Sequence, residues 1–159
     1  MANLREITIV SGGQTGADRA ALDFAIEHDI PHGGWCPRGQ PAKDGSIPTR
    51  YQLKETPSRK YSQRTEWNVR DCDATVVFSV APNPAGGTAL TLAVARRLEK
   101  PFLHLCRATS SVAEAAGELL SFLDEHQVRR LNIAGPRASQ EPEVAAFVRD
   151  VLQAALSRH

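Results

Sequence analysis

Two glycine-rich turns, each standing between a β-branched run and a stretch with helical spacing, constrain the fold of this chain most. The first, residues 11–19, reads Ser-Gly-Gly-Gln-Thr-Gly-Ala-Asp-Arg and follows the run Ile7–Val10. The second, Gly-Gly-Thr at residues 86–88, comes after the run Thr75–Phe78. A strand, a glycine turn and a helix together point backbone N–H groups and a positive helix end at an anion. Two such units in 159 residues predict a small α/β protein that binds a phosphate-bearing ligand.

Strand-like and helix-like segments alternate along the whole chain. Alternation and β-branched content predict strands at Glu6–Val10, Ile30–Trp35, Thr75–Phe78, Phe102–Leu105 and Leu131–Ala134. Apolar spacing or helix-permissive composition predicts helices at Thr15–His28, Tyr61–Arg70, Thr88–Ala95, Val112–His126 and Glu141–Leu156. We expect the helix at Thr88–Ala95 to be largely buried, and the last helix to carry Pro142 near its first turn. Residues 36–59, with four prolines and two glycines, are expected to form a long irregular loop.

This order of elements predicts an α/β fold. Strands that alternate with helices form a parallel sheet that is covered on both faces. We therefore expect residues 1–159 to form a single Rossmann-like ligand-binding domain. Its open, mainly parallel sheet is expected to have about five strands, with helices on both faces.

Composition limits the functions that are open to the chain. The net charge of +1 indicates no general affinity for nucleic acid or acidic membranes, so affinity for anions has to be local. The three cysteines, Cys36, Cys72 and Cys106, have no C-x-x-C spacing, which argues against disulfide frameworks and thiolate zinc sites. No apolar run approaches the ~18 residues that span a bilayer, and no signal segment opens the chain. We expect a cytoplasmic protein without a protein-ligated metal.

Neither glycine turn matches a standard nucleotide motif. The first lacks the Gly-Lys-Ser/Thr ending of a P-loop and has Asp18-Arg19 instead, which does not support NTP hydrolysis. No acidic residue closes the second predicted strand to hold a ribose, which disfavours NAD-dependent redox chemistry. Glycines after strands also serve simply as tight turns. The threonine that follows each turn favours binding, because Thr15 and Thr88 can cap a helix and donate to a phosphate.

Long strings of this chain resemble the molybdenum carrier family, also called molybdenum cofactor carrier proteins. The strings are residues 11–23 (SGGQTGADRAALD), 31–39 (PHGGWCPRG), 44–45 (DG), 55–57 (ETP), 64–71 (RTEWNVRD) and 86–90 (GGTAL). The resemblance covers roughly residues 7–101. It implies a Rossmann-like homodimer or homotetramer that binds molybdenum cofactor, a pterin with a dithiolene and a terminal phosphate. It also implies molybdoenzymes or cofactor-insertion proteins as partners.

The chain is more distantly similar to the lysine decarboxylase-like group of cytokinin-activating phosphoribohydrolases. These enzymes carry Arg-Lys on the helix before a Gly-Gly-x-Gly-Thr-x-x-Glu turn. Matching the strand Thr75–Phe78 to theirs places Arg64 on their arginine and Thr91 on their catalytic glutamate. Threonine does not act as a base near neutral pH, so this departure favours binding over glycosidic cleavage and leaves no catalytic residue to name.

Two other classes of function remain open. The first is a hydrolase acting on a nucleotide or nucleotide-derived metabolite, in which Asp18, Asp44 or Glu66 replaces the missing glutamate. The second is an accessory protein for DNA or protein processing, against which the low net charge and the absence of a Lys/Arg run count.

The expected ligand-binding residues come from both turns and from two neighbouring segments. They are Gly12, Gly13, Gln14, Thr15, Gly16, Arg19, Trp35, Arg64, Asn68, Gly86, Gly87 and Thr88. Arg64 and Asn68 are four residues apart and share one helix face. Arg19 is a candidate phosphate ligand, although it can equally pair with Asp23 one turn later on the helix surface.

Several further side chains have two interpretations. Trp35 can stack on a flat ligand, Trp67 is expected in the core, and Asp18 can simply face the dipole of the first helix. Cys36 can bind a metal or a dithiolene, or simply fill apolar space as a small side chain. The charged loop residues that could close over a ligand are Lys43, Asp44 and Arg50.

Overall fold

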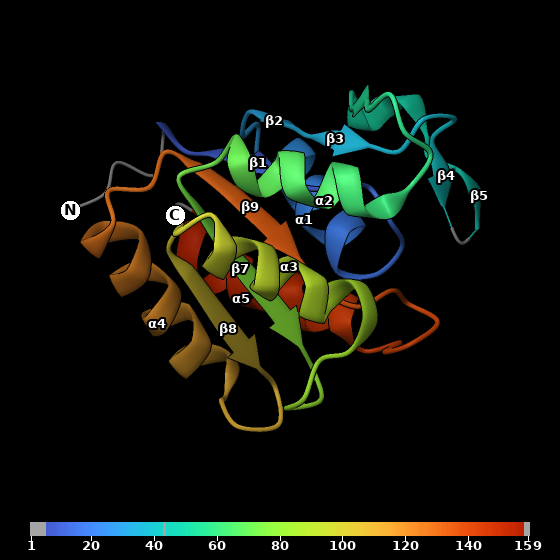
Figure 1. The fold of residues 1–159 in the computed structure, drawn as a ribbon. Coiled ribbons are helices and arrows are strands. Elements are labelled where there is room, and N and C mark those ends of the chain that lie inside the picture. Colours follow the sequence, from blue (N-terminus) through green and yellow to red (C-terminus); the bar gives the residue numbers. More distant parts are fainter. Residues whose placement is uncertain (1–5, 43, 158–159) are drawn as a thin grey trace.

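The computed structural model describes residues 6–42 and 44–157 and has a five-stranded sheet at its centre (Figure 1). Its strands are β1 (Thr8–Val10), β2 (His32–Gly33), β7 (Ala74–Ser79), β8 (Phe102–Cys106) and β9 (Arg130–Ala134). They lie in the order β2-β1-β9-β7-β8, and every neighbouring pair is parallel. The predicted Rossmann-like α/β fold is therefore confirmed.

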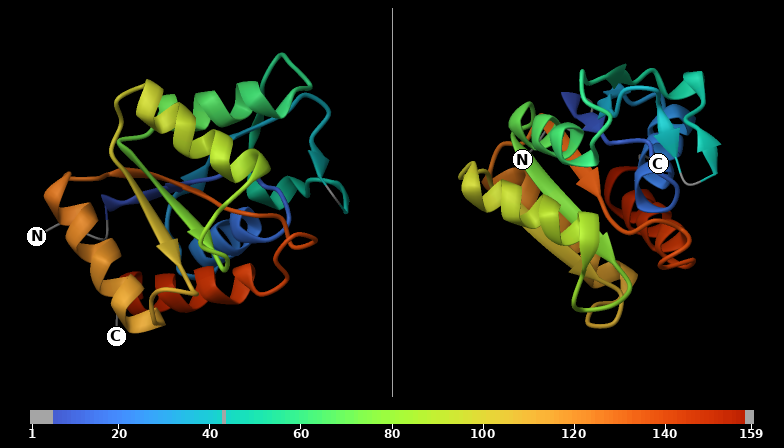
Figure 2. Two further views of the ribbon diagram at one scale, coloured as in Figure 1. Left: turned by 60° about the horizontal axis from the view of Figure 1, so that its bottom comes forward. Right: turned by 45° about the vertical axis from the view of Figure 1, so that its right-hand side comes forward.

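Helices cover the two faces of this sheet unequally. The helices are α1 (Ala17–Glu27), α2 (Tyr61–Arg70), α3 (Gly86–Arg97), α4 (Val112–Glu125) and α5 (Val144–Leu156). On one face α5 packs against both α1 and α4, and on the other α2 packs against α3. Figures 1 and 2 show the sheet between these two layers.

The last strand of the chain lies in the middle of the sheet. β9 pairs with β1 through Leu131 and Ile9, and with β7 through Ile133 and Val76. If β9 and α5 preceded β1, the strand order would read 3-2-1-4-5, which is the common doubly wound order. The chain therefore has the Rossmann arrangement with its first strand and helix moved to the C-terminus. In such sheets ligands bind where the strand order reverses, here at the carboxyl ends of β9 and β7.

Alternation along the strands divides the buried side chains between the two faces. Val76 and Phe78 of β7 join the large apolar cluster under α1, α4 and α5. The opposite layer has a much smaller cluster, Val69, Val94 and Ala95, with Leu98 packed against it. The expectation of a largely buried helix at residues 88–95 is wrong, because Ala89, Leu90 and Ala93 are exposed on α3 and Leu90 is 37% exposed.

The second predicted strand and the long irregular segment differ from expectation. The strand β2 ends at Gly33, because Gly34 (φ 143°) lies so close to the backbone of Ser11 that a Cβ would meet its carbonyl oxygen at 2.1 Å. The segment that follows is ordered into two small sheets rather than irregular. These pair β3 (Trp35–Cys36) with β6 (Lys54–Glu55), and β4 (Pro41–Ala42) with β5 (Gly45–Ser46), around a 3₁₀ turn at Thr49–Tyr51.

Three helix starts also differ from the prediction. Gly16 is the N-cap of α1, and α3 begins at Gly86 after Ala85, so neither Thr15 nor Thr88 caps a helix. The last helix begins at Val144, which leaves Pro142 in the preceding loop. Among the described residues, no helix has the length and apolar character needed to cross a membrane.

Candidate functional site

A cavity of about 300 Å³ opens at the carboxyl ends of β1 and β9, next to the point where the strand order reverses. Both glycine turns contribute to its wall, and α2, α3, β9 and the loop after β9 complete it. The residues that line it are Gly12, Gln14, Asp18, Tyr61, Arg64, Thr65, Asn68, Gly86, Gly87, Thr88, Leu90, Thr91, Asn132, Ile133, Ala134, Gly135, Arg137 and Gln140. The fold therefore brings both turns, far apart in sequence, to one site.

The first turn contributes Gly12 and Gln14 to the cavity. A Cβ on Gly12 would lie 2.3 Å from a guanidinium nitrogen of Arg64 and 3.0 Å from a carboxylate oxygen of Asp18. A side chain at this position would displace the ends of the Arg64 and Asp18 side chains from the backbone. Gly13, Thr15 and Gly16 do not line the cavity. Gly16 (φ 89°) instead lies against the backbone of the loop after β9.

Of the residues that line the cavity, one, Asp18, has an acidic side chain. It is 7% exposed, and its carboxylate accepts a hydrogen bond from the backbone N–H of Gln14 at 3.2 Å. Burial raises the pKa of Asp18 above its ordinary value, and this effect outweighs the opposing charge of Arg64. The carboxyl group therefore takes up a proton more readily than an exposed aspartate. The other two acids proposed for catalysis lie elsewhere, because Asp44 pairs with Arg19 and Glu66 with Arg97.

Helix α2 supplies Arg64 and Asn68 from one face, as the spacing predicts. A guanidinium nitrogen of Arg64 donates to the Gly12 carbonyl oxygen at 2.9 Å, which ties α2 to the first turn. Asn68 is buried, and its amide accepts from the backbone N–H of Trp35 (2.8 Å) and donates to the Trp35 carbonyl oxygen (3.0 Å). Arg64 therefore retains donors for a ligand, while the amide of Asn68 positions β3.

The second turn forms the first residues of α3. Gly86, Gly87 and Thr88 all line the cavity, so the backbone N–H groups at the start of a 12-residue helix lie at its wall. Thr91, one turn later, also lines the cavity, and its hydroxyl donates to the Gly87 carbonyl oxygen at 2.9 Å. That hydroxyl is engaged within the helix.

Sequence reasoning missed the loop between β9 and α5, which adds Gly135, Arg137 and Gln140 to the cavity. Asn132 on β9 also lines it, and its amide donates to the Thr75 hydroxyl at 3.2 Å. The sequence Gly-Pro-Arg directly after a strand is itself a signal for a functional turn. Its importance depends on the central position of β9, which the sequence alone does not reveal.

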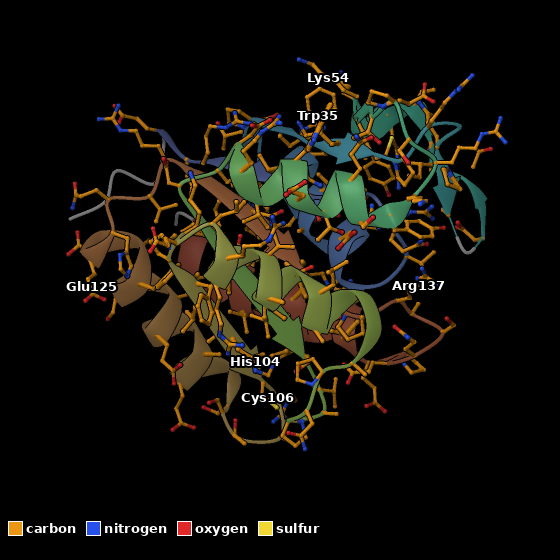
Figure 3. All side chains as sticks on the ribbon, in the orientation of Figure 1. Trp35, Lys54, His104, Cys106, Glu125 and Arg137 are labelled. Carbon is orange, nitrogen blue, oxygen red and sulfur yellow. The ribbon has the colours of Figure 1, made fainter. Side chains whose placement is uncertain are left out.

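Besides Thr15, the predicted ligand-binding side chains of Arg19 and Trp35 lie outside the cavity wall. Arg19 forms a bidentate ion pair with Asp44, including a 2.8 Å contact, and its Nε donates to the Gly13 carbonyl oxygen. Trp35 packs edge-to-face on Trp67 and donates from its indole nitrogen to Asp71 at 2.8 Å. Figure 3 shows Trp35 beside Lys54, well away from Arg137 at the cavity.

Of the loop candidates, Asp44 and Arg50 are likewise engaged elsewhere. Arg50 pairs with Asp23 and stacks on Tyr51, and Lys43 lies outside the described residues. Cys36 is buried with Leu22, Ile47 and Tyr51 and does not line the cavity. In residues 6–42 and 44–157, no group of three or more His, Cys, Asp or Glu side chains is arranged to hold a metal ion.

A parallel sheet of this order, with a cavity beside its switch point, defines a Rossmann-like α/β protein. The model of the circularly permutated YpsA SLOG family matches residues 9–156, and the chain belongs to this family. A crystal structure titled putative molybdenum carrier protein, from Syntrophus aciditrophicus SB, is 48% identical and superposes with a TM-score of 0.93 over 96% of each chain. The resemblance to molybdenum carrier proteins is thereby confirmed. No curated protein matches the chain.

Proposed function

We propose that this protein is a carrier that binds molybdenum cofactor, or a closely similar phosphate-bearing heterocycle, in the cavity between the two glycine turns. The observation that carries the proposal is the convergence of both turns, the second of which begins α3, and of Arg64 on one cavity of about 300 Å³. Backbone N–H groups at a helix start and a guanidinium are the groups that proteins use to bind phosphate. The name of the 48% identical relative, a molybdenum carrier protein, supports a ligand that contains molybdenum.

The side chains around the cavity favour binding over turnover. Arg64 supplies charge, and the amides of Gly87 and Thr88 supply neutral donors. The hydroxyl of Thr91 is bonded to the Gly87 carbonyl oxygen and is a poor base in any case. These groups stabilise a bound ligand, and none of them is a nucleophile or a base that would attack it.

The test is a titration of the purified protein with molybdenum cofactor in anaerobic buffer, followed by the change in ligand absorbance. We expect saturable binding at micromolar levels, weakened at least about tenfold in Arg64→Gln because a charge-assisted hydrogen bond is lost. Arg97→Gln removes an exposed, ion-paired arginine outside the cavity and serves as the matched control. Wild-type protein that binds no cofactor at these levels contradicts the proposal.

A second function is favoured by one observation, the burial of Asp18 in the cavity wall with a raised pKa. Such a carboxyl group holds its proton to a higher pH than an exposed aspartate, which suits a general acid or base in the hydrolysis of a nucleotide-derived metabolite. Release of free base from nucleoside monophosphates, lost in Asp18→Asn and retained in Asp150→Asn, would establish this activity. No release by the wild type excludes it for these substrates.

A further inference from the structure

The loop between β9 and α5 occupies the position of the first strand-to-helix turn in a 3-2-1-4-5 sheet, which is where Rossmann proteins bind phosphate. Three hydrogen bonds hold the loop in this position. The N–H of Ala17 donates to the Pro136 carbonyl oxygen at 3.3 Å, and a Cβ on Gly16 would collide with that same oxygen at 2.5 Å. At its other end the Glu141 carboxylate accepts the backbone N–H groups of Val80 (2.7 Å) and Ala81 (2.9 Å). The loop therefore bridges the segments that follow β1 and β7.

Two guanidinium groups meet on one aromatic ring at the cavity. The guanidinium carbon of Arg64 lies 5.2 Å from the ring centroid of Tyr61, and that of Arg137 lies 5.1 Å from it. All three side chains line the cavity. Within the described part of the chain neither arginine forms a salt bridge, in contrast to Arg19, which pairs with Asp44. Stacking on a ring orients a guanidinium and leaves its in-plane N–H donors open.

The charges around the cavity match a doubly charged anion. Among the residues that line it, the ionisable side chains are Asp18, Tyr61, Arg64 and Arg137. Arg64 and Arg137 together supply two positive charges, and neither forms a salt bridge within the described residues, whereas the buried Asp18 carboxylate accepts the Gln14 N–H at 3.2 Å. A phosphate monoester carries a charge of about −1.5 to −2 at neutral pH and offers three free oxygens. A phosphodiester carries one charge and lacks one of those oxygens.

We propose that Arg137 and Arg64, both stacked on Tyr61, form a clamp that selects ligands ending in a phosphate monoester over phosphodiesters. The inference rests on the proposed binding of a phosphate-bearing ligand and narrows it to one phosphate class. Arg137 is the determinant of this selectivity, because Arg64 also has a structural bond to Gly12. A dinucleotide form of a ligand, which ends in a substituted pyrophosphate, is excluded by the same clamp.

Isothermal titration with adenosine 5′-monophosphate, its 5′-phosphate methyl ester and inorganic phosphate tests the clamp. We expect the wild type to bind the monophosphate about tenfold or more tightly than its methyl ester. Arg137→Gln should remove most of this preference, Arg137→Lys should retain part of it, and Arg149→Gln, exposed on α5, should leave it unchanged. Thermal unfolding of each variant checks that the fold is kept.

Equal affinity of the wild type for the monophosphate and its methyl ester overturns the clamp, and so does an unchanged preference in Arg137→Gln. Absence of monophosphate and phosphate binding overturns it as well. The titration with molybdenum cofactor separates this result from the carrier proposal. Cofactor binding without monoester selectivity leaves the carrier and removes the clamp, whereas selectivity without cofactor binding leaves the clamp and removes the carrier.

Discussion

Asp18 is the residue whose environment departs furthest from what its position in the sequence implies. An aspartate in the first turn of a helix ordinarily lies in solvent and is stabilised by the helix dipole. Here the Asp18 side chain is instead buried beside the first glycine turn and lies near the guanidinium group of Arg64. The sequence identifies the residue and its helix position. It does not predict burial, because burial depends on where α2 and β9 lie.

The raised pKa of Asp18 predicts a pH-dependent stability difference. The folded state holds the proton more tightly than the unfolded chain, so wild-type stability falls as pH rises from the ordinary carboxyl pKa through the raised one. Asp18→Asn lacks this loss. Its free energy of unfolding relative to wild type should therefore increase over that pH window, as measured by urea unfolding at a series of pH values. Exposed Asp150→Asn is the control, and parallel curves for Asp18→Asn and wild type would contradict the burial argument.

For Asn68 we predict that substitution lowers the free energy of unfolding rather than acting directly on ligand binding. Removing its amide in Asn68→Ala leaves two partly buried Trp35 backbone groups without their partner. We expect a loss of roughly 2–4 kcal/mol in urea unfolding. Ser62→Ala, exposed on the same helix, should change stability by less than about 0.5 kcal/mol. A loss in Asn68→Ala as small as the control's would mean that these hydrogen bonds do not hold β3.

At the scale of elements, the sequence predicts several helices closely. Helix α4, which has a long periodic apolar pattern, agrees with prediction to within one residue, and α2, predicted from helix-permissive composition, agrees to the residue. The segment after Gly33 could not be predicted, because strands of two residues carry too little pattern to read. Its order comes from tertiary contacts such as the cluster of Leu22, Cys36 and Ile47.

Helix α4 carries a capping box that gives a clean test at this scale. The Ser111 hydroxyl accepts from the Glu114 N–H at 3.1 Å, and the Glu114 carboxylate accepts from the Ser111 N–H at 3.0 Å. Ser111→Ala should cost about 1 kcal/mol in urea unfolding because the Glu114 N–H at the helix start loses its partner. Ser110→Ala, one residue earlier, should cost less. Equal costs for the two variants would show that the box does not stabilise α4.

At the scale of the whole molecule, the position of β9 explains both what could be predicted of the site and what could not. The two glycine turns are visible in the sequence, and they do meet at one cavity. Arg137 could not be found, because the order in which strands assemble is set by long-range packing and not by local pattern. Arg19 and Trp35 are predicted as ligand-binding residues because each lies near glycines in the sequence. In the structure Arg19 pairs with Asp44 and Trp35 donates to Asp71, and neither side chain lines the cavity.

The three cysteines report on the integrity of the whole fold. Cys36, Cys72 and Cys106 are at most 6% exposed, and burial raises the pKa of the Cys72 thiol to about 12. A thiol reagent should therefore label none of them in native protein within minutes and all three in urea. Quick labelling of Cys36 in native protein would show that the segment of residues 34–59 opens.

The central claim is that one cavity, next to the point where the strand order reverses, holds the ligand. A crystal structure of the protein reconstituted anaerobically with molybdenum cofactor tests it most directly. We predict the terminal phosphate of the cofactor at the start of α3, within hydrogen-bond distance of Arg64 and the backbone N–H of Thr88. Cofactor bound elsewhere, for example stacked on Trp35 with this cavity holding only water, would contradict the account.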